Sequence, residues 1–374
     1  MFKVNVFKTR QFPTIKRDQD LSDRVGKLML LAYIGLFFLF LVLPLGALII
    51  KSLQNSDGDY IGLHNFHIYL NEPALFQSFF NSLFIAVVST IITVILAFAF
   101  AFALTHTRMP FKGFFRLIAL IPLLSPSILA AIALVYWFGN QGVLKELLFG
   151  YSIYGPIGII MASVYWTFPH ALMILSTSLS LSDARLYEAA DVLHTSKFRA
   201  FLTITVPGAR YGIISTTFVI FTQVFTDFGV PKVIGGNYNV LATDIYKEVV
   251  GMQNFQMGAV ISLVLLLPAI LAFFVDQYSR KRQVALLSSR SVVFEPKKYR
   301  TLDMAMLVFC GLITVIILMM IGMAQLGALV KFWPYNLSLT LKHYSFDVAG
   351  LGWESFYNSI RLAFYTAVFG TVII

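Results

Sequence analysis

Two acidic residues stand out as candidates for function: Glu188, in a polar loop between two long apolar runs, and Asp227, inside an apolar run. A carboxylate at membrane depth can hold a cation or a proton, or it can accept bonds from backbone amides freed at a helix break. Motifs for catalysis are missing from the sequence: it has no Gly-x-x-x-x-Gly-Lys-Ser/Thr phosphate loop, no His/Glu zinc motif and no Gly-x-Ser-x-Gly nucleophile elbow. The sequence therefore indicates no ATP binding of the P-loop kind in this chain and disfavours an enzyme.

The composition indicates an all-α protein that crosses a membrane many times. The chain has 374 residues, of which 58% are hydrophobic and only 12% charged. Such a chain is too apolar for a soluble protein, and a membrane-spanning helix needs about 20 apolar residues. The apolar runs predict spans near 28–50, 83–105, 115–138, 155–178, 211–232, 257–275 and 304–330, with an eighth beginning near Asn358.

The net charge of +10 reflects topology and not a nucleic-acid surface. Most of the 28 Lys and Arg residues lie before the first apolar run, between the second and third, between the fourth and fifth, and after the sixth. Loops rich in Lys and Arg stay in the cytoplasm. The N-terminus and the loop that holds Glu188 are therefore predicted to be cytoplasmic, and no nucleic acid is expected as a partner.

That loop predicts two short helices. Ser180 and Asp183 suit a helix start, and a first helix is predicted from about Asp183 to Leu193. Its expected apolar face consists of Leu186, Ala189, Ala190 and Leu193. Thr195 and Ser196 can cap a second helix, in which Phe198, Phe201 and Leu202 share a face until Pro207 interrupts the pattern.

The spacing within this loop carries a family resemblance. Glu188-Ala189-Ala190 is followed after thirteen residues by Ile204-Thr205-Val206-Pro207. The register resembles the cytoplasmic coupling loop of ABC importer permeases, with His194 in place of a Gly and Val206 in place of a Leu. A Gly there suits a turn with positive φ, which costs a His more. An ordinary amphipathic loop on the membrane surface is the alternative.

The resemblance implies partners and roles. In that family the loop docks in a groove of a cytosolic ABC ATPase dimer, which binds the ATP and Mg, so this chain itself is expected to hold no cofactor. The role is carried onto Glu188, Ala189, Ala190, His194 and Pro207. A periplasmic or extracellular solute-binding protein and the lipid bilayer are the other implied partners.

Short internal matches predict a second, parallel unit. Phe79-Phe80-Asn81-Ser82-Leu83 recurs as Phe356-Tyr357-Asn358-Ser359-Ile360, and Gly46-Ala47-Leu48 as Gly327-Ala328-Leu329. The expected domains are a cytoplasmic tail (1–27), a six-span permease unit (28–280), a basic linker (281–303) and the first two spans of a second unit (304–374). Because spans seven and eight lack most of their own unit here, we expect them to bury their polar and small faces poorly.

A second resemblance concerns the solute. Residues 226–246, which begin Thr226-Asp227-Phe228-Gly229, resemble the same region in fused permeases for ferric ion, polyamines and phosphonates, and most of all the permeases of 2-aminoethylphosphonate importers. Asp227 is predicted about 24 Å into a core about 30 Å thick. Asp227, Phe228 and Gly229 are thus candidates for the solute pathway. The alternative is that Asp227 only satisfies backbone amides at a helix break.

Together these features predict a permease subunit of a bacterial ABC importer in the cytoplasmic (inner) membrane. A small polar solute, with 2-aminoethylphosphonate favoured and ferric ion or a polyamine as alternatives, would be moved inward by a separate ATPase. Two other functions stay open: an ion-coupled secondary transporter with Asp227 as its carboxylate, and a membrane scaffold without transport. Other polar and helix-breaking residues in the spans are weaker candidates: His170 is expected to be a hydrogen-bonded bundle histidine, and Pro122, Pro126 and Pro268 are expected to kink their helices.

Overall fold

The computed structural model describes residues 21–286, 294–345 and 352–373. It divides into two units, one made of residues 48–354 and the other of residues 1–47 with 355–374. Most of the predicted tail, residues 287–293 of the predicted linker and residues 346–351 lie outside the described residues.

The smaller unit consists of apolar helix. In its N-terminal part, α1 (Leu21–Phe37), a π-helical turn η1 (Phe38–Val42) and α2 (Leu43–Ser52) follow one another without a break. Large apolar side chains are exposed along this stretch, such as Leu28 and Phe40. Its other part belongs to α16 (Gly352–Ile373), which begins earlier than the predicted eighth span.

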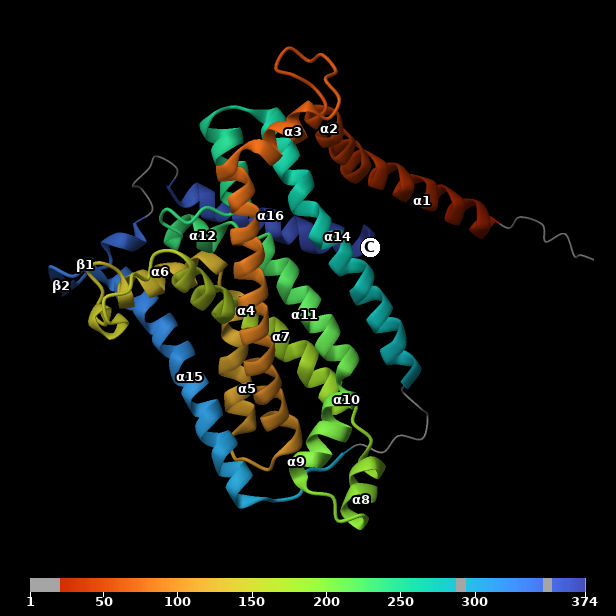
Figure 1. Ribbon diagram of the computed structural model, residues 1–374, viewed down its shortest axis with the longest axis vertical. Coiled ribbons are helices and arrows are strands. Elements are labelled where there is room, and N and C mark those ends of the chain that lie inside the picture. Colours follow the sequence, from red (N-terminus) through yellow and green to blue (C-terminus); the bar gives the residue numbers. More distant parts are fainter. Residues whose placement is uncertain (1–20, 287–293, 346–351, 374) are drawn as a thin grey trace, which may run out of the picture. The chain divides into compact units, whose positions relative to one another are not determined.

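The larger unit is a bundle of tilted helices with short helices at both ends (Figure 1). Its long helices are α4 (Pro73–His106), α7 (Pro156–Ser180), α11 (Arg210–Phe225), α14 (Phe255–Leu286) and α15 (Arg300–Leu329). Between them lie α3 (His64–Asn71), α5 (Lys112–Leu120), η2 (Ile121–Leu124), α6 (Ser127–Phe138) and η3 (Lys145–Leu148). The segment from 183 to 208 forms α8 (Ala184–Val192), α9 (Lys197–Ala200), η4 (Phe201–Thr205) and α10 (Val206–Gly208). After α11 come α12 (Gly229–Ile234), α13 (Leu241–Tyr246) and η5 (Lys247–Gly251).

Five described helices are long and apolar enough to cross a membrane, or seven if each of two bent pairs counts as one span. α16 is not among them, because polar residues such as Asn358 and Arg361 interrupt its apolar sequence. The all-α expectation holds apart from a short hairpin of β1 (Val330–Phe332) and β2 (Asn336–Leu339). Trp333 of this hairpin donates a hydrogen bond from Nε1 to the backbone oxygen of Gln141 at 3.2 Å.

The predicted third span is not straight. α5 with η2 and α6 meet at an angle of 102°. The break falls at Ser125 and Pro126, both of which have extended backbone. A proline disfavours helix in the residue before it and has no N–H to continue the ladder, so the chain turns here. Pro268, by contrast, lies inside α14 without ending it.

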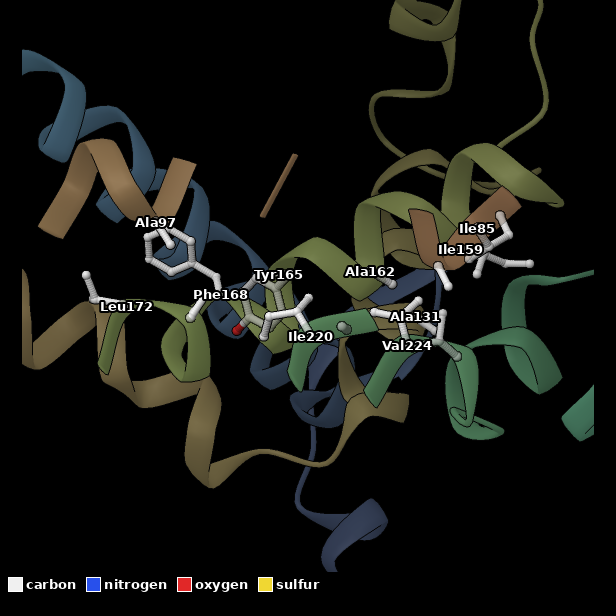
Figure 2. Close-up of a cluster of buried hydrophobic side chains, with 14 of the residues drawn as sticks. Ile85, Ala97, Ala131, Ile159, Ala162, Tyr165, Phe168, Leu172, Ile220 and Val224 are labelled. Carbon is white, nitrogen blue, oxygen red and sulfur yellow. The ribbon is translucent and has the colours of Figure 1, made fainter. Parts of the chain in front are cut away.

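The core of the bundle is built on small residues. α4 packs along α7 and α11, and α11 packs along α14. Figure 2 shows Ala97, Ala131 and Ala162 among larger side chains such as Phe168 and Ile220. All three alanines are fully buried. Small residues let helix backbones approach closely, which supports helix association where lipid removes the hydrophobic drive.

Span seven, which was expected to be poorly buried, has one buried side. α15 packs against α5, α6 and α4 of the first predicted permease unit. Cys310, Thr314 and Ile317 on one side of it are buried. The most apolar stretch of α15 is nevertheless only 22% buried, against 44% in α4 and 56% in α7. The expectation of poor burial therefore holds for most of this helix and fails for the side that contacts the first unit.

A close contact between α11 and α7 supplies a first prediction. A Cβ added at Gly212 of α11 would lie 2.3 Å from the Cβ and Oγ of Ser178 in α7. Gly212→Ala should therefore lower the free energy of unfolding by about 1–3 kcal/mol, as overpacking does. Thermal unfolding in detergent measures the loss.

Gly311→Ala in α15 is the matched control, since a Cβ there meets nothing within 4 Å among the described residues. Ser178→Gly should restore most of the stability lost in Gly212→Ala. Equal stability of the two single alanine variants would contradict this account of the α7–α11 contact.

Candidate functional site

The 183–208 segment begins with a capped helix. Asp183 has extended backbone, and its side chain accepts a hydrogen bond from the Arg185 backbone N–H at 3.1 Å. This is an N-cap bond, which satisfies one of the amides left free at a helix start. Ser180 does not take part: it belongs to the last turn of α7, where its hydroxyl donates to the Thr177 backbone oxygen. The predicted helix is confirmed, with Asp183 alone as its cap.

The end of α8 shows what His194 does. Its φ is +48°, in the left-handed region that the resemblance implied for this position. The His194 N–H donates to the Asp191 backbone oxygen at 3.1 Å, and the Thr195 N–H donates to the Ala190 oxygen at 2.9 Å. These two bonds form a Schellman motif, which ends a helix and satisfies its last carbonyls. A glycine would adopt this conformation without the steric cost that histidine pays.

The second half of the segment is less regular than predicted. Ser196 caps α9 by accepting from the Arg199 N–H at 3.3 Å, whereas Thr195 is used in the turn. Pro207 does not break the helix, because it lies in the first turn of α10, where a proline is tolerated. The bend of 64° comes two residues later, at Ala209.

The apolar residues of the segment divide between two faces. Ala190 and Ala200 are buried. Several larger ones point outward, in disagreement with the predicted common faces; these are Leu186, Val192, Leu193, Phe198 and Leu202, each at least 49% exposed. Glu188 and Ala189 are also exposed. Such an apolar surface next to an acidic residue is typical of a contact site for a partner or a membrane.

Tyr187, the residue before Glu188, ties the inner face to the bundle. Its hydroxyl lies 3.1 Å from His106 Nε2 at the end of α4 and 2.9 Å from Thr205 Oγ1. Burial raises the pKa of the Tyr187 phenol. Tyr187 and His106 were not predicted as site residues, because no spacing rule brings two residues 81 positions apart into contact.

Asp227 lies between two helices and not inside one. α11 ends at Phe225 and α12 begins at Gly229, so the predicted span 211–232 is interrupted at Asp227. The carboxylate accepts from the Val230 N–H at 3.0 Å and from the Ser127 hydroxyl at 2.9 Å. It thus bonds the first turn of α12 and the first residue of α6.

Phe228 and Gly229 surround this bridge. The Phe228 ring is 37% exposed and lies 5.3 Å from the ring of Tyr246. A Cβ at Gly229 would come within 2.7 Å of Ser127 Oγ, so the contact between the two helix starts needs a glycine. This geometry is that of a carboxylate satisfying backbone amides, and the pathway role of all three residues stays a prediction.

Residues 94–284 match the family described as binding-protein-dependent transport system inner membrane component. The chain belongs to this family. The matched residues include both the 183–208 segment and Asp227.

The chain is also similar to individual permease proteins, at low sequence identity. The chain is 27% identical, over 389 residues, to the ferric transport system permease protein FbpB of Actinobacillus pleuropneumoniae, covering 98% of this chain and 55% of the relative. It is 25% identical to the spermidine/putrescine transport system permease protein PotB of Escherichia coli, covering 63% of this chain and 91% of that one. The chain thus spans about half the length of the ferric relative.

Among solved structures, a bacterial alginate ABC transporter in complex with an alginate pentasaccharide-bound periplasmic protein is similar in fold. The TM-score is 0.57 at 16% identity, over 72% of this chain and 97% of that chain. This likeness concerns the fold alone.

The turn at His194 leads to a second prediction. His194→Gly should leave the free energy of unfolding unchanged or raise it by up to about 1 kcal/mol, because glycine reaches positive φ without strain. His194→Val should lower it, since a β-branched residue is an outlier there. Thermal unfolding of the purified chain measures both.

Val192→Gly is the control, because Val192 lies two residues before His194 and is the last residue of helix α8. Glycine there should cost roughly 0.5–1 kcal/mol. A loss of the same size in His194→Gly would show that the left-handed turn does not govern this position.

The Asp227 bridge supplies a third prediction. Asp227→Asn keeps an acceptor oxygen and should fold normally, whereas Asp227→Leu leaves two donors unpaired and should cost about 1–3 kcal/mol of stability. Unfolding in detergent separates the two variants.

If the solute pathway also runs past this carboxylate, Asp227→Asn should fold but take up solute more slowly. Wild-type uptake by that variant would contradict the pathway role.

Proposed function

We propose that this chain is a permease subunit of a bacterial ABC importer, and that its 183–208 segment receives the cytosolic ATPase. The observation that carries the proposal is the outer face of that segment: an exposed acidic residue, Glu188, between exposed apolar residues, on two capped helices that project from the bundle. Membership in the family and the register of Glu188-Ala189-Ala190 support the same role. They favour the importer over the ion-coupled transporter and the scaffold.

The orientation follows from charge. Lys197, Arg199 and Arg210 lie in or next to the segment, and basic loops face the cytoplasm. The segment and the N-terminus would then be cytoplasmic in the inner membrane. A solute-binding protein would meet the opposite side, which carries the β1–β2 hairpin and the α12–α13 region.

The organisation is proposed to be that of a two-unit permease. The relative PotB, which matches over 63% of this chain, is covered to 91% of its length, whereas FbpB is covered to 55%. These figures support one permease unit near residues 28–280 followed by the start of another, parallel unit.

The solute is proposed to be small and polar. The similar chains include permeases named for ferric ion and for spermidine and putrescine. The resemblance of residues 226–246 favours 2-aminoethylphosphonate, whose ammonium group has the same sign of charge. Uptake of each solute by the assembled transporter, with the others as competitors, selects among them; competition by none of the three would reject this class.

Replacement of Glu188 by Lys tests the ATPase contact. Reversing a charge in a partner's groove typically costs several kcal/mol through like-charge juxtaposition or an unpaired buried charge. We expect Glu188→Lys to lower ATP-driven uptake by roughly tenfold or more, the equivalent of about 1.4 kcal/mol. Uptake and ATP hydrolysis are measured in vesicles that contain the full transporter.

Glu188→Gln, which removes the charge without reversing it, is the comparison and should lose less. Because Glu188 is exposed, both variants should insert and fold normally, as their yield in the membrane fraction shows. Wild-type uptake by Glu188→Lys with the ATPase normally bound would refute the proposed role.

A further inference from the structure

The residues just before α15 lie against the 183–208 segment. We call residues 294–303, which include the first turn of α15, the linker segment. Phe294 stacks on the His106 ring with centroids 4.9 Å apart and an interplanar angle of 25°. It also lies 4.3 Å from the Tyr187 ring. The linker segment therefore covers the residues that tie α8 to the end of α4.

A charge cluster joins the same two segments a turn further along α8. The Asp191 carboxylate pairs with Lys197 Nζ at 2.8 Å and with Lys297 Nζ at 2.5 Å. Lys197 also lies over the Tyr299 ring, 4.8 Å from its centroid. Hydrogen bonds from the two lysines lower the pKa of Asp191 to about 2, so its carboxylate is charged at neutral pH. One acid thus links α8, α9 and the linker segment.

The far end of the linker segment is fixed to a second cytoplasmic loop. Asp303 is buried, and its carboxylate accepts from the Arg108 N–H at 2.9 Å and from the Tyr299 N–H at 3.2 Å. The second bond holds the start of α15, and the first joins α15 to the loop after α4. Between its two ends the linker segment closes one side of a cavity of 530 Å³, whose other walls include Phe102, Tyr187 and Phe201.

We propose that the linker segment is a clamp that holds the 183–208 segment, so that α8 and α9 move as one body with the start of α15. The clamp itself does not depend on the proposed ATPase contact. Only its effect on transport rests on that proposal. If α8 receives the ATPase, then the clamp passes its displacement directly to the first helix of the second predicted unit. The second unit would respond to the first unit's loop as well as to any loop of its own.

Limited trypsin cleavage tests the clamp without using transport. Lys297, Lys298 and Arg300 are cleavage sites in the linker segment, and cleavage needs the segment to open. In the membrane-embedded chain, Asp191→Asn should speed cleavage there by roughly two- to fivefold, the range expected for exposed ion pairs.

Glu188→Gln is the matched control, because it removes one negative charge from the same helix at an exposed residue for which the described chain shows no ion pair. It should cleave at the wild-type rate. At about 1 M salt, where charges are screened beyond about 3 Å, the difference between Asp191→Asn and wild type should shrink. Equal cleavage of wild type and Asp191→Asn at low salt would overturn the clamp.

Phe294→Ala removes the aromatic contact and should speed cleavage independently of salt. Both variants are first shown to keep the wild-type melting temperature, so that faster cleavage reports the linker segment and not global unfolding. The ATPase is absent from this assay. The trypsin result can therefore contradict the clamp while the Glu188 prediction holds, and the Glu188 prediction can fail while the trypsin result supports the clamp.

In the full transporter, Lys297→Gln should lower the uptake obtained per ATP hydrolysed. Lys298→Gln, its exposed neighbour without an ion pair among the described residues, should not. An unchanged ratio in Lys297→Gln, with the linker segment shown to be open by trypsin, would overturn the mechanical role of the clamp.

Discussion

Every backbone amide and carbonyl at membrane depth must find a partner within the protein, and this constraint shapes the bundle. The long helices satisfy it internally. The chain nevertheless breaks at Pro126 and again after Phe225, and one carboxylate connects the two breaks. Asp227 bonds the first turn of α12 and, through Ser127, the start of α6. Gly229 allows the close approach that the bridge needs, so one acid and one glycine hold the starts of α6 and α12 together.

The same reasoning shows which parts of the fold could be predicted from sequence. Apolar runs located the helices, because span length is set by the bilayer. The missing glycine in the coupling pattern pointed to a left-handed turn, and His194 adopts one, since the pattern of local hydrogen bonds at a helix end depends on neighbouring residues only. Asp183 and Ser196 were found as caps for the same reason.

Long-range packing was not predictable in this way. Pro126 was expected to bend the third span and does so, but the angle of 102° between its two halves was not predicted. α15 was expected to be poorly buried, but Cys310 and Thr314 pack onto the first unit. The contacts of Tyr187 with His106 and of Asp191 with Lys297 join residues 81 and 106 positions apart. An apolar pattern in the sequence predicts that a helix face is buried, but it does not indicate which part of the protein packs against that face.

The two faces of α8 explain why Glu188, Ala189 and Ala190 differ in exposure. Tyr187 and Ala190 face the bundle, where Tyr187 bonds His106 and Ala190 is 7% exposed. Glu188 and Ala189 between them face outward. A larger side chain at position 190 would push α8 away from the bundle. A larger side chain at position 189 would point outward and leave the contact between α8 and the bundle intact. Two alanines that look equivalent in sequence are thus small for different reasons. The first faces outward, where the bundle does not limit its size, and the second lets α8 lie close enough to the bundle for Tyr187 and Asp191 to reach their partners.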